Sequence, residues 1–330
     1  MSTEPVDVLI IGGGPAGLTA ALTLARQLHT AILLDSQSYR NGNAPFMHMI
    51  PTWDHKDPAL FRAQARQEIL SNYSTIRMED TTVEKAEKGD DGLFRVTDAN
   101  GHVWQGRKLI LATGSKDIFP DIPGYADAWG KRIFHCLFCK GYEDRTAKRA
   151  GVLAIQSAAN VPMAMHQAEN AAQLAAQVTI YTNGAEELGS QLTATLSSQG
   201  SNAMFKVDNR EITGLALNGD DLSAPVSVQV QLADGSQVEE AFLVHNPNTQ
   251  VKSSLATQLG LDLAPSFVPG TGDVAAVAPF HQTSLRGVFA AGDCITPYKV
   301  VAGAISSGCN AAVAASAQLL AEKYDHQPLF

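Results

Sequence analysis

Two cysteines three positions apart are the residues in this sequence with the most specific chemistry. Cys136 and Cys139 enclose Leu137 and Phe138. Two thiols at this spacing can close a small disulfide ring and exchange it through a mixed disulfide, provided that a lowered pKa supplies the thiolate. A zinc site would need two further ligands, and the sequence offers only His135 nearby and no second CxxC or HxxxH. We predict redox chemistry and no metal, with a pair of packed core cysteines as the alternative.

A glycine-rich loop near the start of the chain predicts a dinucleotide site. Gly12, Gly14 and Gly17 fit G-x-G-x-x-G, in which the first glycine allows a tight turn. The second lets the backbone approach a pyrophosphate, and the third lets a helix pack on a strand. Asp35 stands where an acid binds an adenosine ribose, and it would repel a 2′-phosphate, which favours FAD or NAD. The loop has a complete strand–helix–strand context, with apolar runs over 7–11 and 31–34 and helical spacing over 18–26.

A second motif near the end of the chain favours FAD. The segment 283–293 contains a threonine and a short apolar strand that ends in Gly292-Asp293. It resembles the second FAD fingerprint of flavoproteins with two dinucleotide domains. By that resemblance Asp293 binds the ribityl chain, and the segment Ala112-Thr113-Gly114 is the connecting ATG motif. A terminal aspartate alone could equally cap a helix, so the prediction of FAD rests on both motifs together.

These motifs need two α/β domains to position them. A second strand–helix–strand pattern covers 151–155, 162–176 and 178–181, and strands are expected over 208–217, 226–232 and 238–244. Proline and glycine breaks lie at 118–125 and 246–248. We predict an α/β fold with two Rossmann-like dinucleotide-binding domains, the second inserted into the first. The expected parts are an FAD-binding domain over 1–117 and 246–330 and an inserted module over 118–245.

Composition limits the function classes. The chain has 330 residues and a formal net charge of −9, from 24 Lys and Arg against 33 Asp and Glu. Such an acidic balance argues against nucleic acid or an anionic membrane as the main partner. No apolar run approaches the roughly 18 residues that a membrane helix needs. Without an evident export signal, the cytoplasm is the expected location.

The whole arrangement resembles the low-molecular-weight thioredoxin reductases, which pass electrons from NADPH through FAD to a CxxC. That resemblance implies a second glycine loop and basic residues for a 2′-phosphate. This chain has Gln156-Ser-Ala-Ala-Asn160 at the loop and Tyr181-Thr-Asn183 where arginines are expected. No Lys or Arg occurs between Arg149 and Lys206. We therefore predict a degenerate nucleotide site, because several charge-assisted hydrogen bonds would be missing.

A narrower family is more similar. The motifs that carry the resemblance are Arg26-Gln-Leu-His-Thr30, Tyr39-Arg-Asn41, Met47-His-Met49, Trp53-Asp-His55, His135-Cys-Leu-Phe-Cys139, Gly141-Tyr-Glu143, Gly292-Asp-Cys294 and Thr296-Pro297. They resemble the gliotoxin-type dithiol oxidases of natural-product biosynthesis. The resemblance implies oxidation of a small-molecule dithiol to an intramolecular disulfide, with O2 reduced to H2O2, and a homodimer. Two alternatives stay open: a thioredoxin-type disulfide reductase fed by NADPH or another donor such as a ferredoxin, and a flavoprotein that sequesters a dithiol without turnover.

The resemblance also assigns roles to residues. A substrate thiolate is expected to attack Cys136, while Cys139 faces the flavin. Lys140 follows Cys139 where thioredoxin reductases have an aspartate, so His135 and Glu143 are the candidate replacements for the acid and base. The cofactor-binding residues implied by the motifs are Gly12, Gly14, Pro15, Ala16, Gly17, Asp35, Ser36, Arg40, Asn41, His48, Ala112, Thr113, Gly114, Gly292 and Asp293.

Overall fold

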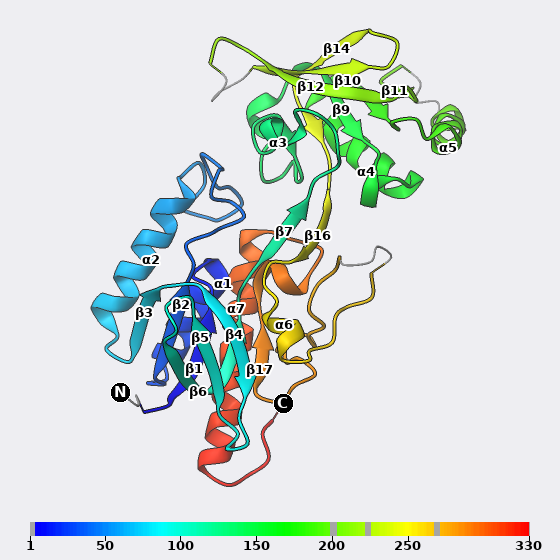
Figure 1. The fold of residues 1–330 in the computed structure, drawn as a ribbon. Helices are drawn as coiled ribbons and strands as arrows, with labels where there is room; N and C mark the ends of the chain where they lie inside the picture. Colours follow the sequence, from blue (N-terminus) through cyan, green and yellow to red (C-terminus); the bar gives the residue numbers. More distant parts are fainter. Residues whose placement is uncertain (1–3, 199–202, 222–225, 267–270, 330) are drawn as a thin grey trace. The chain divides into compact units, whose positions relative to one another are not determined.

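The computed structural model describes residues 4–198, 203–221, 226–266 and 271–329. The chain forms two compact units. Unit 1 comprises residues 1–116 and 249–330, and unit 2 comprises residues 117–248. The expected domain boundaries, after 117 and after 245, therefore lie within three residues of these limits. One mainly parallel and one fully parallel sheet, each flanked by helices, confirm the predicted α/β fold with two Rossmann-like domains (Figure 1).

Unit 1 is built on a seven-stranded sheet in the order β3-β2-β1-β6-β5-β4, with β17 also paired to β6. The strands β1, β2, β3, β6 and β17 are parallel, so their carboxyl ends lie at one edge of the sheet. That edge is where ligands of such sheets bind. The strand bounds are β1 Val6–Ile11, β2 Ala31–Asp35, β3 Ile76–Asp80, β4 Val83–Lys88, β5 Phe94–Asp98, β6 Val103–Leu111 and β17 Val288–Ala290.

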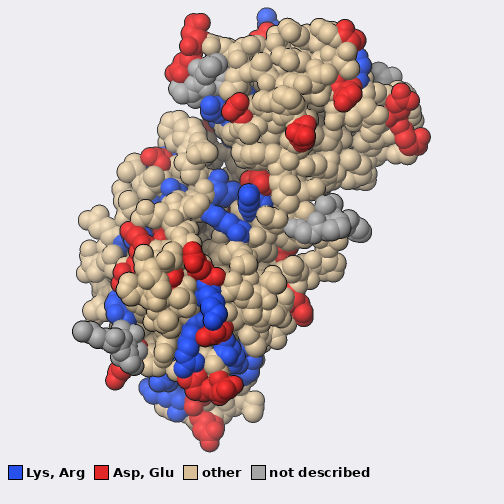
Figure 2. Space-filling model, in the orientation of Figure 1, with Lys and Arg blue, Asp and Glu red and all other residues tan. Residues whose placement is uncertain are grey.

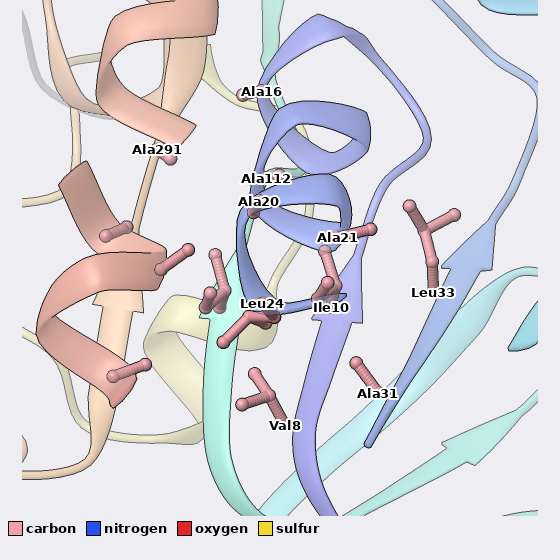
Figure 3. Packing of buried hydrophobic residues seen from close by; sticks show 14 of the residues in the cluster. Val8, Ile10, Ala16, Ala20, Ala21, Leu24, Ala31, Leu33, Ala112 and Ala291 are labelled. Carbon is pink, nitrogen blue, oxygen red and sulfur yellow. The ribbon is translucent and has the colours of Figure 1, made fainter. Parts of the chain in front are cut away.

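The continuous apolar run of β1 follows from burial on both faces of the sheet. Val8 and Ile10 pack into one core cluster, and Leu9 and Ile11 pack into the other. Figure 3 shows the first cluster, in which α1 lies against β1. The helices of unit 1 are α1 Pro15–Ala25, α2 Pro58–Asn72, α6 Leu255–Gln258 and α7 Val301–Lys323.

Unit 2 has a five-stranded parallel sheet in the order β11-β10-β9-β15-β8 and a three-stranded antiparallel sheet in the order β12-β13-β14. Its strands are β8 Ile133–Phe134, β9 Ala147–Leu153, β10 Ala175–Tyr181, β11 Phe205–Asp208, β12 Ile212–Asn218, β13 Ser227–Leu232, β14 Gln237–Glu240 and β15 Leu243–Val244. Its helices are α3 Tyr125–Ala128, α4 Val161–Ala172 and α5 Glu186–Ser198.

The chain crosses between the units twice. The crossings are β7, Ser115–Ile118, and β16, Asn248–Val251, which pair as a two-stranded sheet (Figure 1). The break expected over 118–125 therefore begins at the end of a strand and runs into α3.

Two details differ from a simple reading of the sequence. The run over 238–244, expected as one strand, is divided into β14 and β15, which belong to different sheets. Fully buried Phe242 lies in the connection, which explains its apolar pattern. In the described part of the chain, α7 alone is long and apolar enough to cross a membrane by length and composition. Ten of its residues are buried, and most of the apolar ones belong to the core of unit 1, as in a core helix.

On one face of unit 1, surface charges of both signs are interleaved (Figure 2). On the face shown in Figure 2, Lys and Arg side chains of unit 1 alternate with Asp and Glu side chains, and the coloured atoms form no extended basic surface there. This pattern agrees with the acidic net charge of −9.

Candidate functional site

The loop between β1 and α1 packs tightly on one side and is open on the other. Gly12 has a φ of +113°, and a Cβ there would lie 2.3 Å from the carbonyl oxygen of Ala112. A Cβ on Gly17 would lie 1.9 Å from the carbonyl oxygen of Gly12. A Cβ on Gly14 would meet nothing within 4 Å. Because no side chain caps α1, and Pro15 occupies its first turn, the helix N-terminus can accept an anion such as a pyrophosphate.

Asp35 lies at the end of β2 and is buried, with 2% of the residue exposed. Its carboxylate accepts hydrogen bonds from the backbone N–H of Gln37 (3.0 Å), the hydroxyl of Tyr39 (2.5 Å) and Nη1 of Arg66 (3.1 Å). A carboxylate offers about four acceptor positions, so one remains for a ribose hydroxyl. Gly13 permits this arrangement, since a Cβ there would lie 2.1 Å from Oδ2 of Asp35. Sequence reasoning identified the carboxylate but not its two side-chain partners.

The other predicted residues of the segment after β2 lie in different settings. Nη1 of Arg40 is 3.7 Å from Oδ2 of Asp293, which brings together two residues predicted at the cofactor. Oδ1 of Asn41 accepts a hydrogen bond from Nη1 of Arg62 at 3.1 Å. Ser36 follows β2 directly and is exposed.

His48 lies in a hairpin closed by the backbone pairing of Met47 with Lys56. Its Nε2 is 3.1 Å from Nδ1 of His55. This histidine pair has no signal in the spacing of the sequence, because its members come from the two arms of the hairpin.

The ATG motif and the Gly292-Asp293 turn follow β6 and β17, at the same edge of the sheet as the glycine loop. Ala112 donates its N–H to the carbonyl of Ile11 at 2.8 Å. Gly114 and Gly292 adopt φ values of +71° and +81°, a region that favours glycine. The open glycine loop, the uncapped helix and the buried carboxylate thus lie on adjacent parallel strands, and this set of groups fits FAD.

Unit 2 carries the disulfide. Cys136 and Cys139 are bonded to each other in a helical turn that follows β8, with their Cα atoms 5.2 Å apart. The N–H groups of Cys139 and Lys140 donate to the carbonyl of Cys136, each at 3.1 Å. The N–H of Cys139 also lies 3.1 Å from Sγ of Cys136. Leu137 packs against the core of unit 2, whereas Phe138 is 70% exposed.

The residues beside the disulfide have identifiable partners. The ring of half-buried His135 is tilted against Trp129, with centroids 6.1 Å apart. Glu143 is exposed and accepts a hydrogen bond from the N–H of Gly141 at 3.1 Å. Lys140 donates from Nζ to the carbonyl of Gly130 at 3.0 Å.

The hydrogen bond of Lys140, which directly follows Cys139, therefore connects the disulfide turn to the turn before β8. Its Nζ also lies 4.9 Å from the ring centroid of Phe134. Burial lowers the pKa of Lys140, and neighbouring Arg132 adds to the lowering. Lys140 directly follows Cys139 in the sequence, whereas in the structure its side chain contacts the Gly130 carbonyl and the Phe134 ring.

Side chains of the loop between β9 and α4 form hydrogen bonds with the backbone of neighbouring segments and of α4. Gln156, with a φ of +50°, donates from Nε2 to the carbonyl of Ile118 and accepts from the N–H of Asn248 through Oε1, both at 3.2 Å. Ser157 donates from Oγ to the carbonyl of Asn246 at 2.6 Å. Asn160 caps α4 by accepting from the N–H of Met163 at 3.0 Å. In a dinucleotide-binding unit, this loop and helix end are where glycines admit the phosphates.

A buried histidine near this loop was missed by sequence reasoning. His245 is fully buried after β15, and its Nδ1 is 2.6 Å from the hydroxyl of Tyr125. Its Nε2 is 3.4 Å from the carbonyl of Ile155. Burial lowers the pKa of His245 to about 4, so the imidazole is neutral near pH 7.

Fold and site together define a flavoprotein that combines a dinucleotide-binding unit with a CxxC disulfide. Residues 6–318 match the family of pyridine nucleotide-disulphide oxidoreductases. The chain belongs to this family, in its thioredoxin reductase-like branch, as the resemblance to the gliotoxin-type enzymes led us to expect. It is an oxidoreductase, and its cofactor is FAD, as predicted.

Similar proteins cover nearly the full length. The chain is 46% identical to "Thioredoxin reductase tcpT" of Claviceps purpurea, over 100% of this chain and 99% of that protein. It is 45% identical to "Thioredoxin reductase aclD" of Aspergillus oryzae, over 97% and 98%. Among solved structures, HlmI superimposes with a TM-score of 0.84 at 28% identity, covering 98% and 96% of the two chains. An oxidoreductase from Agrobacterium tumefaciens gives 0.82 at 32% identity, covering 96% and 99%.

Proposed function

We propose that this protein oxidises a small-molecule dithiol to an intramolecular disulfide through Cys136 and Cys139, with O2 as the final electron acceptor and H2O2 as the product. One observation supports this direction above all: the loop that would hold NADPH in unit 2 is filled by side chains. Gln156 bonds to both chain crossings, at Ile118 and Asn248. Ser157 bonds to Asn246, shortly before β16, and Asn160 caps the N-terminus of α4. A nicotinamide donor would have to displace these bonds.

Charge in the same region supports the proposal. Tyr181 ends β10, where the partner of a 2′-phosphate is expected, and its hydroxyl donates to Glu240 at 2.7 Å. The sequence has no Lys or Arg between Arg149 and Lys206. Because Tyr181 and Glu240 are both fully buried, a 2′-phosphate at the end of β10 would lack the charge-assisted bonds that basic residues in this segment would supply.

The proposed thiol chemistry balances as two exchanges. A substrate thiolate attacks Sγ of Cys136, the Cys136–Cys139 bond breaks, and Cys139 leaves as a thiolate. The second substrate thiolate then attacks the substrate sulfur of the mixed disulfide, which releases the cyclic product and Cys136 as a thiolate. The N–H of Cys139, 3.1 Å from Sγ of Cys136 in the disulfide form, is positioned to stabilise that leaving thiolate.

The two electrons then leave the enzyme dithiol. Cys136 and Cys139 close again to a disulfide as they give up these electrons, and bound FAD would supply the two-electron acceptor and the route to O2, which is reduced to H2O2. We propose that Cys139 is the cysteine that faces the flavin. His135 precedes Cys136 directly, so we propose it as the group that takes the substrate's thiol proton. Glu143, exposed two residues after Gly141, is the second candidate.

Stopped-flow at 450 nm with the purified holoprotein tests the proposal. Under anaerobic conditions a small vicinal dithiol should bleach the flavin, and NADPH should not. Admission of air should restore the absorbance and produce one H2O2 for each dithiol oxidised. Rapid bleaching by NADPH would overturn the proposal, because the β9–α4 loop would then admit a nucleotide.

A disulfide reductase of thioredoxin type is the second candidate. The names of the two relatives above favour it, since both are thioredoxin reductases. Bleaching by NADPH, or by a reduced ferredoxin, followed by reduction of thioredoxin would support this function. A protein that only sequesters a dithiol would show neither bleaching nor turnover.

The biological setting is proposed from the resemblance. We propose a role in the biosynthesis of, or self-resistance to, a disulfide-containing natural product of the epidithiodiketopiperazine kind. We also propose that the protein works in the cytoplasm as a homodimer. Light scattering of the holoprotein and microscopy of a fluorescent fusion would test these two statements.

A further inference from the structure

A buried lysine in unit 1 holds the turn that carries Asp293. Lys299 has a side chain that is only 4% exposed. Its Nζ donates to Oδ1 of Asp273 at 2.7 Å, to the carbonyl of Asp293 at 2.6 Å and to the carbonyl of Thr296 at 2.6 Å. An ammonium group has three donors, and all three are used in fixed directions.

The same turn is held from two other segments. Ser115, in β7, donates from Oγ to the carbonyl of Asp293 at 2.8 Å, so this oxygen accepts two side-chain bonds. Ser307, in α7, accepts the N–H of Gly292 at 2.9 Å. The backbone of the Gly292-Asp293 turn is therefore fixed by Lys299, Ser115 and Ser307 together. Its conformation does not depend on the turn residues alone, although Gly292 adopts a φ of +81°.

We infer that Lys299 is a positioning residue for FAD, acting through the main chain of Asp293. The carboxylate of Asp293 projects from the atoms that Lys299 and Ser115 hold, and Nη1 of Arg40 lies 3.7 Å from it. Once the backbone is fixed, the carboxylate needs little reordering to meet the cofactor, and preorganisation of this kind raises affinity. Asp273 balances the buried charge of Lys299, which allows an ammonium group to lie in the interior.

This inference depends on FAD but not on the direction of electron flow or on the substrate. A purely structural alternative is that Lys299 and Asp273 form a buried ion pair with no effect on the cofactor. The two alternatives predict different FAD affinities for variants of this ion pair, because loss of an ion pair without a positioning role would change the stability of the protein alone.

The experiment compares three full-length variant holoproteins with the wild-type holoprotein. Ser115→Ala removes one donor to the Asp293 carbonyl and keeps the ion pair. The double variant Lys299→Met with Asp273→Asn removes the brace without leaving a lone buried carboxylate. Lys323→Met, at the exposed end of α7, is the matched control. FAD release on dilution is followed by the rise in flavin fluorescence, and the melting temperature is measured against FAD concentration.

We expect the double variant to bind FAD at least tenfold more weakly and Ser115→Ala several-fold more weakly, with Lys323→Met unchanged. A folded double variant with the FAD affinity of wild type would overturn the inference and leave a structural ion pair. If the double variant does not fold, Ser115→Ala decides, since an unchanged FAD affinity there also overturns it. Neither result bears on dithiol or NADPH bleaching, so the proposed function is tested separately.

Discussion

Acidification should destabilise unit 2 through His245 in particular. Burial lowers the pKa of this histidine to about 4, from an ordinary value of 6.5. Between these two pH values the unfolded state binds a proton that the folded state does not. The contribution of neutral His245 to folding is therefore complete above pH 6.5 and is lost as the pH falls toward 4.

The size of the effect follows from the same shift. At pH 5 the unfolded imidazole is almost fully protonated, and the folded one is almost fully neutral. One pKa unit corresponds to about 1.4 kcal/mol, so the free energy of unfolding should fall by about 2 kcal/mol between pH 7.5 and 5. Other groups titrate in this range, and comparison with a variant isolates the histidine.

His245→Gln is the variant of choice, because an amide can accept from Tyr125 and donate to the Ile155 carbonyl without titrating. The protein would be equilibrated in urea at pH 7.5 and at pH 5 and then labelled by a hydrogen-exchange pulse at one fixed pH. The exchange of peptides from β9 and β10 gives the urea midpoint of unit 2. Exposed His166→Gln, in α4, is the control and should follow wild type. Equal losses of stability in wild type and His245→Gln would refute the reasoning.

Three further predictions concern the disulfide and the buried charges of unit 2. Ser in place of Cys136 or Cys139 should abolish anaerobic flavin bleaching by a dithiol at unchanged FAD content, and persistent bleaching would contradict the exchange mechanism. Lys140→Met should lower the stability of unit 2 by about 1 kcal/mol, through the lost hydrogen bond, and leave the pH profile of turnover unchanged, whereas a shifted profile would make the lysine an acid or base. Burial raises the pKa of Glu240, which costs stability as the pH rises through that value, so Glu240→Gln should stabilise unit 2 more at pH 7.5 than at pH 4.5 in urea unfolding.

The parts of the site that sequence predicted are those whose partners are close in the chain. The glycine loop, its flanking strand and helix, and Asp35 lie within one strand–helix–strand unit, so spacing alone placed them. The CxxC pair is equally local, and its disulfide closes within a single helical turn. FAD followed from joining two local motifs, one at each end of the chain.

The parts that sequence did not predict depend on partners far away. Arg66 reaches Asp35 across 31 positions, and Ser115 reaches the Asp293 carbonyl across 178. The residue types involved, Ser, Lys, Arg and Tyr, are common on surfaces and carry no spacing signal. Lys299 illustrates the difficulty, because a lysine in the sequence predicts an exposed charge, and only the fold shows it enclosed by three acceptors.

For the β9–α4 loop, one part of the description was predicted from the sequence and another part required the structure. Sequence predicted what the loop lacks, namely glycines and nearby cations, but an absence does not say what the remaining residues do. In the structure, Gln156 bonds to the ends of both chain crossings and Ser157 bonds to Asn246, so the side chains that we propose to exclude a phosphate also have partners of their own. In the proposed function, the loss of nucleotide binding and the support of the chain near the crossings rest on the same residues. For this reason a single change to glycine at Gln156 would remove two hydrogen bonds without supplying the cations that NADPH needs.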